Sequence, residues 1–159
     1  MDLMAHSMPR HCREEGFTLT ELLVTILIIS ILAAIAIPAF LDAAGQANDA
    51  PAKEMARTAQ TTGETLGLDN GGSYATVRKA TLHSYESTIA TTSARTDAYL
   101  SAASGTTTTY TLTVTSVASA NKFTIARRAD GTVVRTCTIP KRTSPHGGCA
   151  NVKGTTGSW

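Results

Sequence analysis

The longest apolar run of the sequence most constrains what this chain can fold into. From Leu22 to Leu41 it reads LLVTILIISILAAIAIPAFL. A helix of roughly 20 apolar residues is about 30 Å long, which matches the hydrocarbon thickness of a bilayer. Thr25 and Ser30 interrupt the run, and the hydroxyls of both are able to bond back to helical carbonyls. The run therefore predicts a single membrane-spanning helix.

Two other interpretations of this run stay open from the residues alone. A buried core helix would need more apolar chain around it than the rest of the sequence supplies, because Thr, Ser, Ala and Gly dominate the second half. An ordinary secretory signal peptide would end in a small-residue cleavage site, which AAIA at residues 33–36 would supply. However, the run is long for a signal peptide, and a helix-like sequence continues beyond Pro38.

Glu21 lies at the start of the apolar run. A carboxylate inside a spanning helix costs about 2.5–3.5 kcal/mol on insertion scales, and less near the helix N-terminus, where the macrodipole favours negative charge. If the chain is cut after Gly16, the new amine of Phe17 lies four residues before Glu21. Positions i and i+4 share one face of a helix. The amine and the carboxylate would then neutralise each other, within one chain or between adjacent chains.

The sequence GFTLTELL at residues 16–23 resembles the processing motif of type IV prepilins and pseudopilins. The following run, which ends in AIPAF at residues 36–40, is similar to the N-terminal helix of that family. The resemblance extends over residues 13–60. Thr20 departs from the family pattern, in which an aliphatic residue is usual at this position.

The resemblance implies how the chain is processed and assembled. A prepilin peptidase would cut between Gly16 and Phe17 and, as an N-methyltransferase, would methylate the Phe17 amine. Glu21 would pair with the Phe17 amine of a neighbouring subunit. The apolar helix would first lie in the lipid of the cytoplasmic membrane. It would then form the core of an extracellular homopolymeric fibre, which a pilus assembly platform and its ATPase would build.

Residues 1–16 would be a leader peptide that is removed by this cleavage. Arg10 and Arg13 precede the span, and the positive-inside rule therefore keeps this end of a single-pass protein in the cytoplasm. Met4 and Met8 are alternative start positions to the first methionine, because the leader is long for some pilin classes.

The mature chain would divide into a span at residues 17–41 and a globular head at residues 42–159. One long helix is predicted from residue 17 to about residue 66, and it would provide both the span and the first part of the head. Proline removes a helical hydrogen bond, so kinks are expected at Pro38 and Pro51.

The second half of this helix, within residues 42–67, is rich in alanine and other good helix formers. Its spacing places an apolar face toward the head, formed by Ala52, Met55, Ala59 and Leu66. Gly67 and the sequence Asn70-Gly71-Gly72 are expected to end the helix by supplying left-handed conformations.

Residues 68–105 are interpreted as a connecting loop that carries a short helix at residues 79–87. The expected anchors that pin this loop to the head by packing and hydrogen bonding are Tyr74, Tyr85 and Tyr99.

Period-two alternation of apolar residues and threonines predicts three antiparallel strands at residues 106–117, 122–128 and 132–139. Turn sequences at residues 119–121 and 129–131 join them as a meander over residues 106–139. The apolar face of the meander needs a cover, which the second half of the long helix would provide. The expected class is α+β, with the pilin-like helix packed on a three- to four-stranded antiparallel sheet.

Of the three cysteines, Cys12 would be lost with the leader, which leaves Cys137 and Cys149 near the C-terminus. A bridge between them would contribute about 3 kcal/mol under the chain-entropy model. Metal binding by these cysteines with His146 is a rival interpretation that lacks a fourth ligand, and two free buried thiols are another. The family resemblance implies the bridge, because many type IV pilins carry a C-terminal disulfide loop, here residues 137–149.

The sequence presents no catalytic motif, and we expect a structural subunit without enzyme activity, cofactor or metal. His83 and His146 lie outside nucleophile and metalloenzyme motifs. The first function expected is a type IV pilin serving adhesion, motility or DNA uptake. Alternatives are a pseudopilin of a type II secretion system, and a minor pilin, adhesin or DNA-binding pilin. The last has weak support, since the mature region holds 12 Lys and Arg against 9 Asp and Glu.

Overall fold

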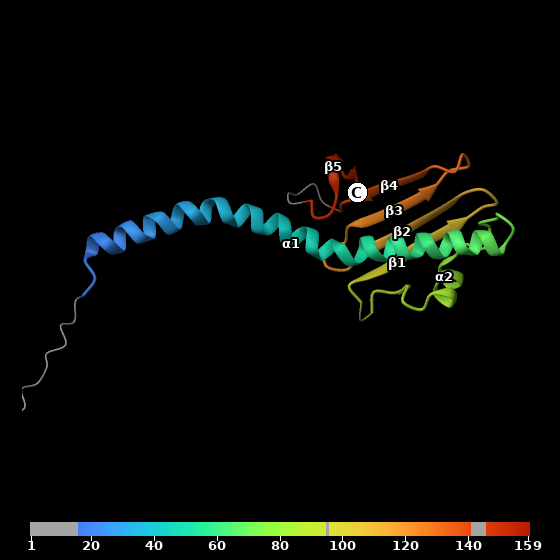
Figure 1. The fold of residues 1–159 in the computed structure, drawn as a ribbon, viewed down its shortest axis with the longest axis horizontal. Coiled ribbons are helices and arrows are strands. Elements are labelled where there is room, and N and C mark those ends of the chain that lie inside the picture. The colour runs from blue at the N-terminus through green and yellow to red at the C-terminus, as the bar shows by residue number, and fades with distance from the viewer. Residues whose placement is uncertain (1–15, 95, 141–145) are drawn as a thin grey trace, which may run out of the picture. The chain divides into compact units, whose positions relative to one another are not determined.

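The computed structural model describes residues 16–94, 96–140 and 146–159 (Figure 1). They fall into two compact units, one that ends at Ile37 and one that runs from Pro38 to Trp159, and each is described by itself. The predictions for the leader, for Cys12 and for the alternative start positions lie outside the described residues.

One helix, α1, runs from Leu19 to Asp69 over 51 residues. The sequence predicts this long helix, and the structure confirms it with bounds that differ by two or three residues. Both Pro38 and Pro51 lie inside α1, and the helix continues through them. The bends predicted at the two prolines stay a prediction.

In the first unit, α1 carries exposed large apolar side chains along the stretch that begins at Leu22 and ends at Ile37. The side chains of these two residues are 56% and 57% exposed. Thr25 donates its hydroxyl to the Leu22 carbonyl at 2.8 Å, and Ser30 donates to the Ile26 carbonyl at 2.6 Å. Both hydroxyls thus bond back to the helix as predicted, and neither leaves an unpaired polar group on the apolar surface.

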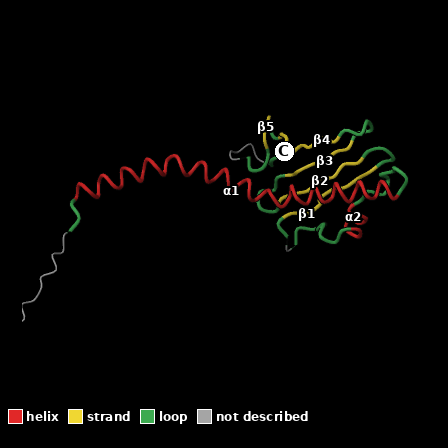
Figure 2. The backbone as a smooth tube through the Cα atoms, in the orientation of Figure 1, coloured by secondary structure: helices red, strands yellow, loops and turns green. Residues whose placement is uncertain are grey.

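The second unit is an α+β head, in which the rest of α1 lies over one antiparallel sheet (Figures 1 and 2). Among the described residues, the sheet has six strands in the order β1-β2-β3-β4-β6-β5, and every neighbouring pair is antiparallel. The elements after α1 are α2 (Lys79–Tyr85), β1 (Ala98–Gly105), β2 (Tyr110–Ser116), β3 (Lys122–Arg127), β4 (Val133–Thr138), β5 (Ala150–Lys153) and β6 (Thr156–Ser158).

The predicted meander is confirmed as β2, β3 and β4, and the predicted short helix is confirmed as α2. The expected strand count of three to four was too low. The end of the predicted connecting loop, residues 98–105, pairs with β2 as the strand β1, and residues 150–158 add β5 and β6. The segment AYLSAASG lacks the alternation of large apolar and polar residues that marks a strand, because its small residues face both ways.

The core of the head forms where small residues of α1 meet large residues of the sheet. Ala52, Ala56 and Ala59 are fully buried on α1, and Met55 packs at the margin of the same cluster. The sheet supplies large buried side chains to this cluster, namely Leu100, Tyr110, Leu112, Val114, Phe123 and Ile125. The predicted apolar face of the helix is therefore confirmed, with Ala56 and Gly63 as further members.

A polar anchor joins the end of α1 to the sheet around Glu64. The hydroxyl of Tyr74 donates to Glu64 Oε2 at 2.7 Å, and the hydroxyl of Tyr110 donates to Glu64 Oε1 at 2.8 Å. The Arg127 guanidinium lies 5.0 Å from the centre of the Tyr74 ring. Hydrogen bonding to Glu64 raises the pKa of the Tyr74 hydroxyl, and burial followed by the same bond raises the pKa of Tyr110.

Of the three tyrosines expected to pin the connecting segment, Tyr74 is buried and anchored, and Tyr99 is half-buried. The expectation for Tyr85 was wrong, since its side chain is 55% exposed at the end of α2.

The glycines that end α1 divide into two roles. Gly71 and Gly72 have φ of 64° and 91°, and the Gly72 N–H donates to the Gly67 carbonyl at 2.7 Å, as the predicted left-handed helix end requires. The expectation for Gly67 was wrong, because Gly67 is helical and its Cα faces the ring of Tyr74. A Cβ at Gly67 would overlap that ring.

Substituting Gly67 and Gly63 by alanine should change stability in opposite directions, although the two lie one turn apart in α1. Gly67→Ala forces the Tyr74 ring away from Glu64 and should lower the free energy of unfolding by about 1–3 kcal/mol. Apart from the adjoining backbone of α1, a Cβ at Gly63 would meet no atom within 4 Å, so Gly63→Ala should raise the free energy of unfolding by about 0.5–1 kcal/mol. Denaturant unfolding of the full chain in detergent micelles, followed by circular dichroism, measures both. A stabilising Gly67→Ala would contradict the assigned contact.

Candidate processing and assembly site

The predicted cleavage residues lie immediately before α1. Gly16 and Phe17 precede the helix, which begins at Leu19, and Phe17 is 82% exposed. The Gly16–Phe17 bond lies outside the helix and is exposed, as access by a protease requires. The structure is that of the uncut chain, in which the Phe17 nitrogen is an amide.

Glu21 and Thr18 form a reciprocal cap at the start of α1. The Thr18 N–H donates to Glu21 Oε2 at 2.9 Å, and the Thr18 hydroxyl donates to the same oxygen at 2.8 Å. In return, the Glu21 N–H donates to the Thr18 hydroxyl oxygen at 3.1 Å. This arrangement is a capping box, which satisfies two backbone donors that the first helical turn leaves without partners.

The capping box gives Glu21 a local role in the uncut chain that the sequence reasoning missed. Thr18, three residues before Glu21, is the signal that would have found it, because a threonine followed by glutamate at this spacing is the signature of the box. Phe17 lies outside the helix, so the expected helical i and i+4 relation between Phe17 and Glu21 does not apply here. The pairing of Glu21 with a free Phe17 amine stays a prediction.

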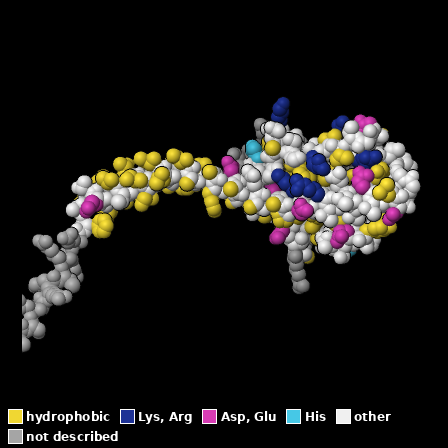
Figure 3. Space-filling model, viewed as in Figure 1, with side chains coloured by type: hydrophobic (Ala, Val, Ile, Leu, Met, Phe, Trp, Pro, Cys, Tyr) yellow, Lys and Arg dark blue, Asp and Glu magenta, His cyan; other side chains and the backbone are white. Residues whose placement is uncertain are grey.

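The helix that follows the capping box is the feature most suited to a membrane or to a bundle of helices. Among the described residues, one helix, α1, is long and apolar enough to cross a bilayer, and no residue of its apolar stretch is buried. Hydrophobic side chains are visible along this part of α1 in the space-filling view (Figure 3). An apolar surface of this extent must be covered by lipid or by other protein, because its exposure to water is strongly unfavourable.

Cys137 of β4 and Cys149 form a disulfide, with their Cα atoms 5.8 Å apart. The bridge confirms the predicted pair and excludes two free thiols. Because both sulfurs are bonded to each other, neither is available as a thiolate ligand, and the rival interpretation with His146 fails on that ground. Over residues 16–94, 96–140 and 146–159, no group of three or more His, Cys, Asp or Glu is arranged to hold a metal ion.

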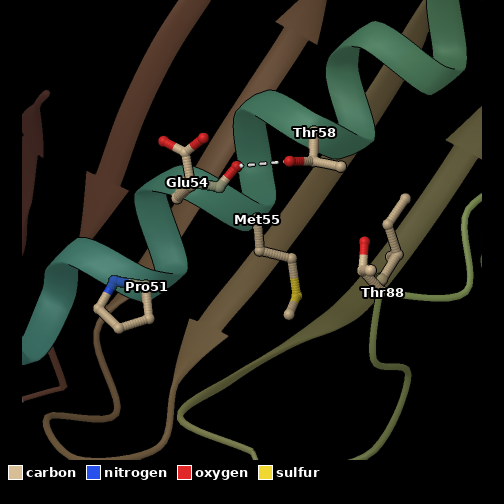
Figure 4. A pocket seen from close by; sticks show the side chains of 6 residues that line it. Pro51, Glu54, Met55, Thr58 and Thr88 are labelled. Carbon is tan, nitrogen blue, oxygen red and sulfur yellow. Dashed lines mark hydrogen bonds between the residues drawn. The ribbon is translucent and has the colours of Figure 1, made fainter.

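The head also carries a hollow beside α1, with a volume of about 290 Å³ (Figure 4). It is lined by Pro51, Glu54, Met55 and Thr58 of α1 and by Thr88 and Ile89 of the segment after α2. Its charged group, the Glu54 carboxylate, lies 3.5 Å from the Arg57 guanidinium, and the Thr58 hydroxyl donates to the Glu54 carbonyl at 3.2 Å. These contacts leave no nucleophile or acid–base pair aimed into the hollow, and we assign it no chemistry.

Comparison with protein families identifies one match. The prokaryotic N-terminal methylation motif matches residues 12–37, which include Gly16, Phe17, the capping box and most of the apolar run. This motif is the type IV prepilin-type signature, and it supports the class of type IV pilins and pseudopilins, which are structural subunits. Comparisons with curated proteins and with solved structures give no match.

The capping box predicts that neutral glutamine can replace Glu21 without loss of the first helical turn. In Glu21→Ala the Thr18 amide loses its acceptor, and in Thr18→Ala the Glu21 amide loses its acceptor, so each amide should exchange about fivefold faster or more. Glu21→Gln keeps a side-chain oxygen at this position and should retain both protections. Amide exchange by NMR on the full chain in micelles makes the comparison, with Thr20→Ala as the control in the same turn. Equal exchange in all four variants would contradict the cap.

Proposed function

We propose that this chain is a type IV prepilin whose mature form begins at Phe17 and polymerises into a surface fibre. The observation that carries the proposal is the combination at the start of α1: an exposed Gly16–Phe17 bond, a carboxylate at Glu21, and a helix whose apolar side chains are exposed on all sides. A passive membrane anchor has no use for a carboxylate at this position, because the charge opposes insertion.

Cleavage would convert the Phe17 amide nitrogen into an amine, which supplies the positive charge that the uncut chain lacks. The capping box holds the Glu21 carboxylate at the end of the helix, with Oε2 accepting two bonds from Thr18. Further lone pairs of this carboxylate stay available for a donor from another chain. An amine and a carboxylate that enter an apolar environment as a pair avoid the large penalty of burying either charge alone.

The same helix would serve two environments in succession. In the membrane, lipid covers its apolar surface, and helix association depends on packing and on polar contacts such as the amine–carboxylate pair. Outside the membrane, the hydrophobic effect would hold the helices of neighbouring subunits together as the fibre core. The Cys137–Cys149 bridge fits an oxidising compartment outside the cytoplasm, where the head would be exposed.

The main competing function is that of a pseudopilin of a type II secretion system, which would share the cleavage and the helix. The C-terminal disulfide loop favours the pilin, and the amount of processed protein on the cell surface separates the two. The decisive experiment is to shear the surface of producing cells and measure intact masses in the sheared and membrane fractions. We expect an abundant sheared species that starts at Phe17, one methyl group heavier and two hydrogens lighter than the unmodified reduced chain.

Either of two other results would overturn a part of this proposal. A processed chain confined to the membrane fraction would support the pseudopilin in place of the pilin. A chain that still carries Cys12 would mean that the motif is not processed and that the protein is an ordinary membrane-anchored domain.

Glu21→Gln separates the charge of Glu21 from its capping role in assembly. If neutralisation of the Phe17 amine drives assembly, Glu21→Gln and Glu21→Ala should both be cleaved normally, and both should reduce the sheared fibre at least tenfold. If capping alone matters, Glu21→Gln should assemble like the unchanged chain, because glutamine also completes the box. Quantifying the Phe17-terminated species in both fractions distinguishes these results, with Thr20→Ala as the matched control.

A further inference from the structure

Asp49 is the first fully buried residue of α1 within the head. The preceding residues of this unit, 38–48, are exposed or half-buried, whereas the side chain of Asp49 has no exposed area. A carboxylate taken out of water is strongly unfavourable unless donors replace the water that it loses. The burial of Asp49 therefore depends on the groups that surround it.

Three donors converge on this carboxylate from two loops. Asp49 Oδ1 accepts from the Ser119 hydroxyl at 2.5 Å, and Oδ2 accepts from Asn121 Nδ2 and from the Gly148 N–H, both at 2.8 Å. Ser119 and Asn121 lie in the turn between β2 and β3, and Gly148 lies just before β5. We call these four residues, Asp49, Ser119, Asn121 and Gly148, the Asp49 clasp.

Two glycines allow the second loop to reach the helix. Gly147 has a φ of 60°, and a Cβ there would overlap Asp49 Oδ2 and lie 3.1 Å from the Gly45 carbonyl. A Cβ at Gly148 would lie 2.6 Å from Lys53 Cε. The backbone of this loop thus packs directly on α1: glycine is required at position 147, and a larger residue at position 148 would have to push the Lys53 side chain aside.

The loop is held in place covalently as well. Cys149 follows Gly148, and its bridge to Cys137 ties the loop to β4. The disulfide, the Gly148 N–H and the Asp49 carboxylate therefore form one chain of connections from the sheet to the helix.

The helix is weak at the place where the clasp holds it. Pro51 has no N–H, so the Ala47 carbonyl loses its helical donor. Next to it, the Ser116 hydroxyl donates to the Asn48 carbonyl at 3.0 Å, which attaches the same turn to β2. Bonds from the sheet side thus support a turn that the helix alone stabilises poorly.

From this arrangement we propose that Asp49 is a positioning residue, which fixes the point where α1 becomes attached to the head, and that the Cys137–Cys149 bridge acts on the helix through it. With the bridge closed, the Gly148 N–H is held against the carboxylate, and helix opening is confined to residues before Asp49. With the bridge absent, the part of α1 that is held to the head begins farther along the helix, toward the buried alanines. This inference concerns the head alone and does not depend on fibre formation.

Hydrogen exchange measured by mass spectrometry on the full chain in detergent micelles tests the proposal. The variants are Asp49→Asn, the pair Cys137→Ser with Cys149→Ser, and their combination. Asp42→Asn, an exposed aspartate on the same helix, is the matched control. Asparagine at position 49 replaces one carboxylate oxygen with an NH2 group, so at least one of the three donors loses its acceptor.

We expect the amides of residues 50–55 to exchange at least tenfold faster in Asp49→Asn and in the double cysteine variant, while residues 59–66 keep their protection. The combined variant should show no further loss, because both changes break the same connection. Asp42→Asn should exchange like the unchanged chain.

Four results would overturn the proposal. These are unchanged exchange at residues 50–55 in Asp49→Asn, a loss of equal size at residues 59–66, unchanged exchange at residues 50–55 in the cysteine variant, or additive effects in the combined variant. If Asp49→Asn does not fold, Ser119→Ala removes one of the three donors to Asp49, together with the acceptor of the Asn121 N–H, and should give about a fivefold change confined to the same residues. No change in that variant would also overturn the proposal.

Discussion

The head depends on one complementarity, between the small residues of α1 and the large residues of the sheet. Ala52, Ala56 and Ala59 leave room on the surface of α1, and side chains of the sheet such as Phe123 and Ile125 fill this room. The head has few aromatic residues with which to fill a wider gap between helix and sheet. Bulkier side chains on this face of α1 would hold the sheet farther away, and the sheet would bury less area against the helix. The remaining contacts of the head are made around this apolar layer, which supplies most of the favourable burial.

Two carboxylates of α1 complete the contact at its two ends. Glu64 accepts from Tyr74 and Tyr110. Asp49, about 22 Å away along the helix, accepts from the other three residues of the Asp49 clasp. An apolar layer of alanines does not by itself fix how far α1 is shifted along the sheet, because neighbouring small residues are nearly equivalent. Directional bonds to fixed carboxylates remove this freedom and set the register of helix and sheet.

The sequence predicts those parts of the structure whose signals are local. The long apolar helix and the meander follow from an apolar run and from period-two alternation. The disulfide follows from the family resemblance, which implies a bridge between the two cysteines near the C-terminus. Strand β1 was missed, because AYLSAASG offers no alternation and is made a strand by pairing with β2. Strands β5 and β6, of four and three residues, are too short to carry a pattern. At the candidate site, the spacing of Thr18 and Glu21 contained the capping box, whereas the partners of Asp49 lie 70–99 residues away and leave no local signal.

The two edges of the sheet have a consequence for crowded conditions. On one side, the Leu100 N–H of β1 donates to the Ala90 carbonyl at 2.8 Å, so the segment after α2 occupies part of that edge. On the other side, β5 is short and irregular, with Asn151 at a φ of 51° and an exposed Lys153. Over the residues that the structure describes, neither edge offers a long, flat row of free backbone groups to another strand. Many copies of this head can therefore be held at high local density with little tendency to merge into amyloid-like aggregates.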